Sequence, residues 1–280
     1  MMLRRFRPKF LPTLNDMHPG TSTRINYEEF PSDLLENRRR ITVILPPGYD
    51  HCAARYPVLY LHDGQNLFED HEAAFGVSWR AQATAEQLTL ASRITPVILV
   101  GIANTPARLD EYAPYRNERG TGGRGDLYSR FVLEEVKPFV DAHYRTLPGR
   151  KHTAVGGSSM GGLISLYLAW RYTSAIGQAV VMSPSLWWDE VAILRDLVGE
   201  QTWMRKVRFW LDVGTREGRS SNRGHVPVMV QHARDLVERF DNNGLIPGRH
   251  YYYWEAAGGE HNEAAWAARF DKVLLFLYGK

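Results

Sequence analysis

This sequence of 280 residues predicts an α/β fold, with a mainly parallel central sheet and helices on both of its faces. Two observations predict it. Short apolar segments alternate along the chain with longer segments that have helical periodicity, the order typical of a parallel sheet covered by helices. Several short segments, such as PVILVGI (96–102) and AVVM (179–182), are apolar almost throughout. Strands read this way when both faces of their sheet are covered.

Eight short segments are candidate strands, because they are apolar or alternate in polarity and are bounded by residues common in turns. In chain order they are Thr23–Tyr27, Ile41–Leu45, Val58–His62, Pro96–Ile102, Thr153–Gly156, Gly177–Met182, Val207–Val213 and His250–Trp254.

Five longer segments are candidate helices. In chain order they are Trp79–Leu90, Asp126–Tyr144, Ser159–Tyr172, Val226–Asn242 and Glu263–Tyr278. The last one should pack against the sheet, because apolar side chains recur every three or four residues along it: Trp266, Phe270, Val273, Leu274 and Leu277.

Composition excludes several classes of function. The net charge of +3 is too small to indicate a nucleic-acid partner, and the basic run Arg38–Arg40 is expected to be a solvated strand entry rather than a polyanion site. The single cysteine, Cys52, excludes an intrachain disulfide and a cysteine-based zinc cluster. No histidine pair has the spacing of a helical metal site. We therefore expect no metal and no cofactor.

The chain is expected to form one domain over residues 23–280, preceded by an N-terminal extension at residues 1–22. The extension is basic but has no long apolar core, unlike a secretory signal. No apolar run approaches the ~20 residues that span a membrane. We therefore expect a cytoplasmic protein with no membrane partner; the sequence leaves its oligomeric state open.

The middle of the chain contains the pattern Gly-x-Ser-x-Gly, at residues 157–161. It joins a candidate strand to a candidate helix, which is the setting of the nucleophile elbow in serine hydrolases. Such a turn lifts its central side chain clear of the backbone. Ser159 would also lie at a helix N-terminus, where peptide dipoles favour developing negative charge. We expect Ser159 to be a nucleophile; a glycine-rich turn without catalytic function is the alternative.

A serine nucleophile needs a base, and the base needs an acid. His261 follows two glycines in a loop after the last candidate strand, so it is the expected base. The acid should lie between the serine and the histidine in the chain. Glu217 follows the candidate strand Val207–Val213, whereas Asp212 lies within that strand. Glu217 is favoured as the acid, and Asp212 stays open.

The oxyanion formed in acyl transfer needs two N–H donors. One is expected to be the backbone N–H of Met160, the residue after the nucleophile. The other is expected to be the backbone N–H of Gln65, in the turn after the strand Val58–His62, where Gly64 would allow a close approach. The alternative is that DGQN is simply a favourable turn composition.

Several aromatic and basic residues are candidates for substrate binding. Trp187 and Trp188 follow the strand after the nucleophile helix, so they should lie near Ser159. Arg116 is a candidate for contact with an acidic leaving group, and the alternative, the commoner fate of such a residue, is a solvated surface position. Further candidates, at least half of the aromatic ones expected to be core fillers, are Trp79, Tyr115, Trp254, Trp266, Arg108 and Arg216.

One pattern is expected to be incidental. Residues 120–125 fit Gly-x-Gly-x-x-Gly, but they follow a polar segment rather than a strand. A dinucleotide fingerprint needs a strand before it and a helix after it, so we expect a loop here.

Seven segments together resemble the putative esterase family of α/β-hydrolases, which includes esterase D, siderophore esterases, feruloyl esterases and mycolyltransferases. They are LPPGYD (45–50), YPVLYLHDGQNLF (56–68), DEYAP (110–114), GGSSMGG (156–162), SPSLWW (183–188), DVGTREG (212–218) and GGEHNEAAW (258–266). The resemblance implies the α/β-hydrolase fold, the nucleophile Ser159, the base His261 and the acid Glu217. It also supports an oxyanion hole at Gln65 and Met160. HDGQNLF and GGEHNEAAW are closer to the siderophore esterases than to esterase D.

The expected function is therefore that of a serine carboxylic-ester hydrolase, which forms an acyl-enzyme intermediate from small to medium acyl esters. Its partner would be a small-molecule ester substrate. Three alternatives stay open: an acyltransferase of the mycolyltransferase type, a siderophore trilactone esterase, and a non-catalytic binding module. The complete set of Ser159, His261 and Glu217 argues against the last.

Overall fold

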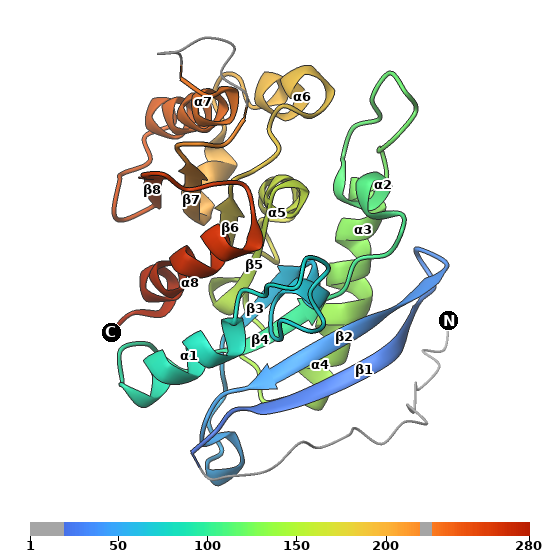
Figure 1. Ribbon diagram of the computed structural model, residues 1–280, viewed down its shortest axis with the longest axis vertical. Coiled ribbons are helices and arrows are strands. Elements are labelled where there is room, and N and C mark those ends of the chain that lie inside the picture. The colour runs from blue at the N-terminus through green and yellow to red at the C-terminus, as the bar shows by residue number, and fades with distance from the viewer. Residues whose placement is uncertain (1–19, 219–225) are drawn as a thin grey trace.

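The computed structural model describes residues 20–218 and 226–280, and within them eight strands form one sheet (Figure 1). The spatial order is β1-β2-β4-β3-β5-β6-β7-β8. The strands are β1 (Thr23–Ser32), β2 (Asn37–Leu45), β3 (Val58–His62), β4 (Ile98–Ile102), β5 (Thr153–Ser158), β6 (Gln178–Met182), β7 (Arg208–Gly214) and β8 (Tyr251–Ala256).

Six strands of the sheet, β3 to β8, are parallel to one another, and the hairpin β1–β2 is added antiparallel at one edge. Leu61 of β3 pairs with Gly156 of β5, and Ser158 of β5 pairs with Met182 of β6. The carboxyl ends of these strands therefore meet at one edge of the sheet, the edge at which open α/β sheets place their ligands.

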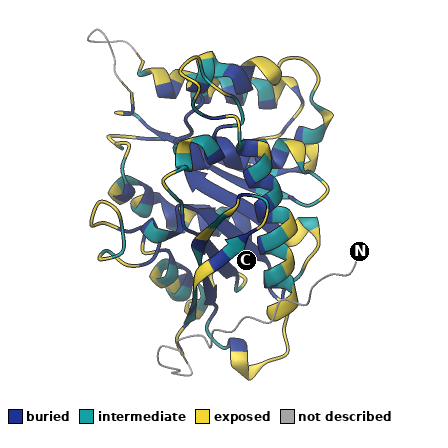
Figure 2. Cartoon of the chain, turned by 90° about the vertical axis from the view of Figure 1, so that its right-hand side faces the viewer, coloured by how far each residue is buried: buried dark blue, intermediate teal, exposed yellow. Residues whose placement is uncertain are grey.

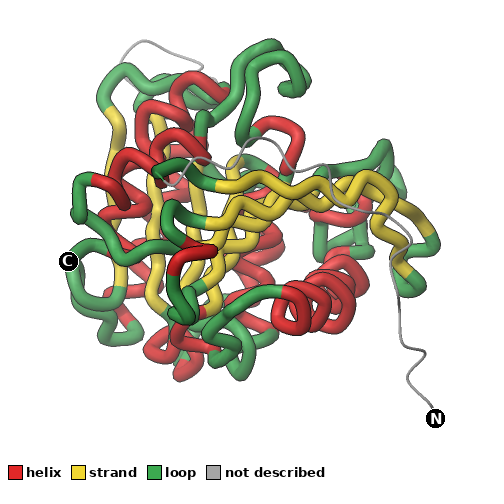
Figure 3. The backbone as a smooth tube through the Cα atoms, turned by 90° about the horizontal axis from the view of Figure 1, so that it is seen from below, coloured by secondary structure: helices red, strands yellow, loops and turns green. Residues whose placement is uncertain are grey.

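Helices cover both faces of the sheet, as Figure 3 shows in the view from below. Apolar residues of α1 and α8 share one buried core, and those of α3 to α7 share the other. The helices are α1 (Ala81–Leu90), α2 (Arg108–Tyr112), α3 (Gly125–Arg130), α4 (Lys137–His143), α5 (Met160–Arg171), α6 (Trp188–Asp196), α7 (Val228–Asn242) and α8 (Glu263–Tyr278).

The central strands lie between two cores. Leu59 and Leu61 of β3 belong to the core under α1 and α8, whereas Tyr60 between them belongs to the opposite core. Every residue of β3, β4 and β5 is buried, and Figure 2 shows dark, buried strands in the interior with most of the exposed residues on the surrounding helices and loops. This burial on both faces explains why their sequences do not alternate in polarity.

The α/β-hydrolase fold predicted from the sequence is confirmed, and each predicted strand and helix has a counterpart. The hairpin is longer than predicted, since β1 continues to Ser32 and β2 begins at Asn37. The solvated position predicted for the basic run is wrong for Arg39, whose side chain is buried in an ion pair of 2.8 Å with Glu111. The carboxylate of Glu111 compensates the positive charge of Arg39, which from the sequence alone was expected to be solvated.

Two helices, α2 and α6, were not predicted. Helix α6 begins at Trp188 with left-handed backbone at Asp189, Glu190 and Val191, so it has no regular first turn that a sequence pattern could indicate. The single helix predicted over 126–144 is present as α3 and α4, joined by a π-helical segment, Phe131–Val136.

The predicted N-terminal extension lies outside the described residues, apart from residues 20–22. In the two stretches that the structure covers, 20–218 and 226–280, none of the helices combines the length and the hydropathy that crossing a bilayer requires.

Candidate active site

Ser159 lies at the reversal between β5 and α5, with φ 58° and ψ −121°. For a residue that carries a Cβ this backbone is strained, and close packing around the turn holds it. A Cβ on Gly157 would lie 3.0 Å from Cα of Gly161, and one on Gly162 would lie 2.8 Å from the carbonyl oxygen of Met182. Gly157 is therefore required by the turn, as the sequence predicted, and so is Gly162 just after the pattern. The prediction is wrong for Gly161, where a Cβ would lie at an ordinary contact distance of 3.4 Å from Cβ of His62.

His261 lies within hydrogen-bond distance of Ser159, with 2.9 Å between His261 Nε2 and Ser159 Oγ. It precedes α8 in the loop after β8. The indole of Trp266 meets the imidazole edge-on, with 5.0 Å between the ring centroids. The loop is also fixed to the one after β7, because Arg216 N–H donates to the carbonyl of Gly259 at 3.0 Å.

Glu217 completes the chain of contacts, with 2.9 Å between its Oε2 and His261 Nδ1. Its side chain is fully buried. Its other oxygen, Oε1, accepts from the backbone N–H of Gly214 at 2.7 Å and from Ser183 Oγ at 2.6 Å. With both oxygens engaged, the carboxylate is held in one orientation towards His261.

Asp212, the alternative acid, points elsewhere. Its Oδ2 accepts from the indole N–H of Trp210 at 2.6 Å, and its Oδ1 lies 3.5 Å from Nη1 of Arg269. Burial raises the pKa of Asp212 to about 6, although Arg269 acts to lower it. The structure thus brings Glu217, and not Asp212, into contact with His261.

The turn predicted to complete the oxyanion hole lies beside the elbow. Gly64–Asn66 forms a single 3₁₀ turn after β3, and β3 and β5 are neighbours in the sheet. A Cβ on Gly161 would lie 3.5 Å from Oδ2 of Asp63, so the start of α5 packs against this turn. Met160 is the first residue of α5, where N–H groups lack intrahelical acceptors. These positions suit the donors predicted at Gln65 and Met160.

Side chains from α2 and from the loop after β4 hold that turn. Asp63, with φ 57°, receives two hydrogen bonds of 2.7 Å from Arg108 and one of 2.6 Å from Asn104 Nδ2. Asn104 N–H in turn donates to Oε1 of Gln65 at 3.1 Å. Arg108 was a candidate for binding an acidic substrate group, but its guanidinium is committed to Asp63.

The predicted substrate-binding residues differ in exposure. Trp187 is 47% exposed, whereas Trp188 is 5% exposed. The indole N–H of Trp188 donates to the carbonyl of Tyr115 at 2.9 Å, which fastens the loop after α2. Arg116 is exposed and pairs with Gly122 in a short antiparallel bridge of that loop. Trp187 and Arg116 therefore present free surface, and Trp188 contributes mainly through packing.

Three polar residues at the site were missed by the sequence interpretation. Ser185 Oγ lies 3.1 Å from Ser159 Oγ, and Ser183 and Arg269 contact Glu217. Ser183 and Ser185 follow a predicted strand that neighbours the strand before Ser159 in the sheet. Their position after that strand is the sequence feature that could have indicated them as site residues. Arg269 lies inside an amphipathic helix, where sequence gives no reason to expect a buried charge.

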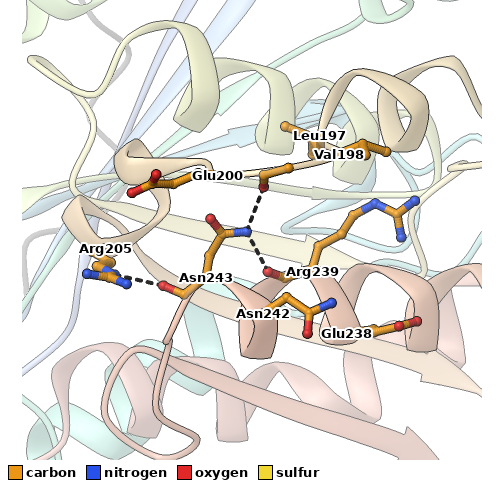
Figure 4. A pocket seen from close by; sticks show the side chains of 9 residues that line it. Leu197, Val198, Glu200, Arg205, Glu238, Arg239, Asn242 and Asn243 are labelled. Atoms are coloured by element: carbon orange, nitrogen blue, oxygen red, sulfur yellow. Dashed lines mark hydrogen bonds between the residues drawn. The ribbon is translucent and has the colours of Figure 1, made fainter.

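No group of residues suited to a metal ion occurs within 20–218 or 226–280. A pocket of about 630 Å³ lies between the end of α6 and the end of α7 (Figure 4), and Ser159, His261 and Glu217 are not among the residues that line it. Asn243 spans its floor, donating through Nδ2 to the carbonyls of Gly199 and Arg239. The side-chain amide of Asn243 is thus occupied in joining the loop after α6 to the end of α7.

A family model and curated relatives indicate one family for this chain, and solved structures share its fold. The model of the putative esterase family matches residues 32–277. The uncharacterized protein YbbA of Bacillus subtilis is 25% identical over 257 residues, covering 89% of this chain and 96% of YbbA. The ferri-bacillibactin esterase BesA of the same species is 26% identical over 238 residues, covering 79% and 77%. A solved ferulic acid esterase superposes with a TM-score of 0.72 at 19% identity, covering 92% of this chain and 98% of that structure.

Proposed function

This chain belongs to the putative esterase family and is a carboxylic-ester hydrolase of the α/β-hydrolase fold, and we propose that it acts through Ser159, His261 and Glu217. The observation that supports this proposal is the unbroken chain of contacts from Ser159 Oγ to His261 and from His261 to Glu217, each of 2.9 Å. Nucleophile, base and orienting acid stand in the order that acyl transfer requires.

In the proposed reaction, Ser159 Oγ attacks the ester carbonyl carbon while His261 Nε2 takes the hydroxyl proton. Glu217 stabilises the resulting imidazolium. The N–H groups of Gln65 and Met160 donate to the tetrahedral oxyanion. The C–O bond to the alcohol then breaks, and the alcohol leaves with the proton from His261. Water repeats the sequence on the acyl-enzyme, releasing the acid and restoring Ser159.

Substrates are proposed to be small to medium acyl esters, bound beside Trp187 and Arg116. Hydrolysis is favoured over transfer because the loop after α2 is polar and its residues Glu118, Arg119 and Gly120 are exposed. Transferases need closed sites that exclude water. A series of p-nitrophenyl esters of graded chain length, with and without an added alcohol or sugar, tests this proposal. If the added acceptor takes most of the acyl group at millimolar concentration, the chain is a transferase instead.

A siderophore trilactone is a second candidate substrate, because one relative is the ferri-bacillibactin esterase BesA. The same purified protein should be assayed on ferri-bacillibactin and on p-nitrophenyl acetate. If kcat/KM were at least about 100-fold higher for the siderophore, the siderophore would replace the small ester as the proposed substrate. A pocket that fits one of two substrates of the same triad typically produces a difference in kcat/KM of about this size.

The cytoplasmic location and the domain division at residue 23 also stay proposals. Fractionation of the native host with an antibody against the chain tests the first. Limited proteolysis tests the second, which expects a stable fragment beginning near Thr23.

A further inference from the structure

The buried carboxylate of Glu217 is backed by a polar cluster, which we call the carboxylate support and which consists of Ser183, Asp212, Trp266 and Arg269. Ser183 Oγ accepts hydrogen bonds from Trp266 Nε1 at 2.9 Å and from Arg269 Nη2 at 3.0 Å. Because these groups can only donate, the single hydroxyl proton of Ser183 goes to Glu217 Oε1, at 2.6 Å. The direction of every hydrogen bond around Ser183 is thereby fixed.

Arg269 supplies the positive charge of the carboxylate support. It extends from α8 and is 2% exposed. Its Nη2 lies 3.5 Å from Oε1 of Glu217, and its Nη1 lies 3.5 Å from Oδ1 of Asp212, while neither carboxylate side chain is exposed to solvent. A buried carboxylate without a partner is strongly disfavoured. Arg269 therefore compensates two acids, only one of which contacts His261.

The charged and titratable groups that face this cluster come from four places. Asp212 extends from β7, Glu217 from the loop after it, His261 from the loop after β8, and Arg269 from α8. Glu263, at the start of α8, accepts from Asn66 Nδ2 at 3.1 Å and also interacts electrostatically with His261, so it is a further acid near the base, outside the carboxylate support. With His261 neutral, both acids ionised and Arg269 charged, the cluster carries one excess negative charge.

We propose that Arg269 is a positioning residue of the ester-hydrolysing site, whose guanidinium balances the charge of Glu217 and thereby sets the pH below which His261 becomes protonated and inactive. This inference rests on the proposed function, because it assigns to Glu217 and His261 their roles as acid and base. It adds that α8, the helix that follows His261, contributes the residue that controls protonation of this base.

The sign of the effect follows from the charges. Protonating His261 or Glu217 adds a positive charge to the cluster, and the nearby guanidinium opposes that addition. Without the guanidinium, His261 holds its proton to a higher pH. The acid limb of the pH–activity profile must then move upward. A purely structural loss would lower activity at every pH and leave the limb where it is.

The test compares Arg269→Met and Arg269→Lys with the unmodified protein, measuring kcat and KM for p-nitrophenyl acetate from pH 4.5 to 9. For Arg269→Met we expect the midpoint of the acid limb to rise by about 1 pH unit, because a positive charge that opposes protonation of the cluster is removed. On the plateau, kcat should fall by about 10-fold with KM unchanged. Arg269→Lys should restore most of the limb position, since it restores the charge.

Two matched controls separate charge from folding. Lys272→Met removes a positive charge from the same helix at an exposed position, where the lysine pairs with Asp271 at 3.3 Å. It should leave the limb in place, because solvent screens exposed charges. Arg39→Met removes another buried arginine from its carboxylate, and its change in Tm calibrates the folding cost.

Should Arg269→Met fail to fold, Asp212→Asn provides an independent variant. It frees Arg269 to act on Glu217 alone, so the acid limb should move downward. If Arg269→Met folds, an acid limb that does not move overturns the inference, and so does an equal shift in Lys272→Met. If Arg269→Met does not fold, an acid limb that stays in place or moves upward in Asp212→Asn overturns it. Full activity in Ser159→Ala or Glu217→Gln would instead overturn the proposed function, so the two failures are distinguishable.

Discussion

At the carboxyl edge of the sheet, two neighbouring turns present reactive groups in different ways. The turn after β5 presents a side chain, Ser159, and the turn after β3 is proposed to present a backbone N–H, that of Gln65. Each turn contains a residue that is not glycine at positive φ, Ser159 at 58° and Asp63 at 57°. Close packing of glycines holds the first turn, and the carboxylate of Asp63, bound by Arg108 and Asn104, holds the second.

The difference indicates where side-chain identity matters. On the side of β5, the proposed nucleophile is a side chain, so its substitution should remove a chemical step, although the backbone N–H of Met160 is also proposed to act there. On the side of β3, only the backbone would touch the substrate, so substitutions should matter when they move that backbone. Five variants, from the largest expected effect to the smallest, test this contrast.

Ser159→Ala should lower kcat by about 10⁴-fold or more, because the nucleophile is lost while the fold stays intact. Steady-state hydrolysis of p-nitrophenyl acetate measures the loss, and circular dichroism checks the fold. A fluorophosphonate probe should label Ser159 in the unmodified protein. Labelling at Ser158 instead would contradict the assignment.

Glu217→Gln should lower kcat by about 10³-fold or more, because an amide can hold His261 in the wrong tautomer. The matched control is Asp212→Asn, a second buried carboxylate 3.5 Å from the same arginine. It should change stability more than plateau kcat. The reverse pattern in the two variants would transfer the acid's role to Asp212.

Gly64→Ala should lower kcat by about 10²-fold, the loss typical of one oxyanion donor. A Cβ at Gly64 would lie 2.7 Å from the carbonyl carbon of Gly101 and 2.7 Å from the nitrogen of Ile102, so the turn must shift away from β4. Gly149→Ala is the control, since nothing lies within 4 Å of a Cβ there. Unchanged kcat in a folded Gly64→Ala would show that this turn does not contribute to the reaction.

Arg108→Met should lower kcat by about 10- to 100-fold with little change in KM, as a displaced catalytic group does. The cause would be release of Asp63, and hence of the backbone that follows it. Arg80→Met is a suitable comparison, because it breaks an exposed arginine–aspartate pair with Asp70 in the same loop. A double variant with Asp63→Asn should add little further loss; additive losses would mean that Arg108 acts on the substrate directly.

Gln65→Ala should cost less than ~10-fold in kcat, because the proposed donor is its main-chain N–H. The Gln65 side chain accepts a hydrogen bond through Oε1 from the backbone N–H of Asn104, at 3.1 Å. A loss of about 10²-fold would show that the Gln65 side chain itself contacts the oxyanion or the substrate, which would remove the contrast between the two turns.

The sequence by itself determined the class of fold and indicated the segments on which the proposed site residues lie. Apolar runs such as 96–102 predicted buried parallel strands because both of their faces had to be covered. Gly157 marked the elbow because a Cβ there would lie 3.0 Å from Cα of Gly161, at the close approach of β5 and α5. These are local requirements of backbone and burial, which short patterns record.

Only the tertiary structure decided which charges face one another. Glu217 and Asp212 are five residues apart in the chain, and their spacing left the choice of acid open. The fold directs Glu217 to His261 and leaves Asp212 to Trp210 and Arg269. It likewise pairs Arg108 with Asp63 and places Arg269 behind Glu217. Each of these contacts joins segments far apart in sequence, so it depends on the packing of α2 and α8 on the sheet, which no local pattern encodes.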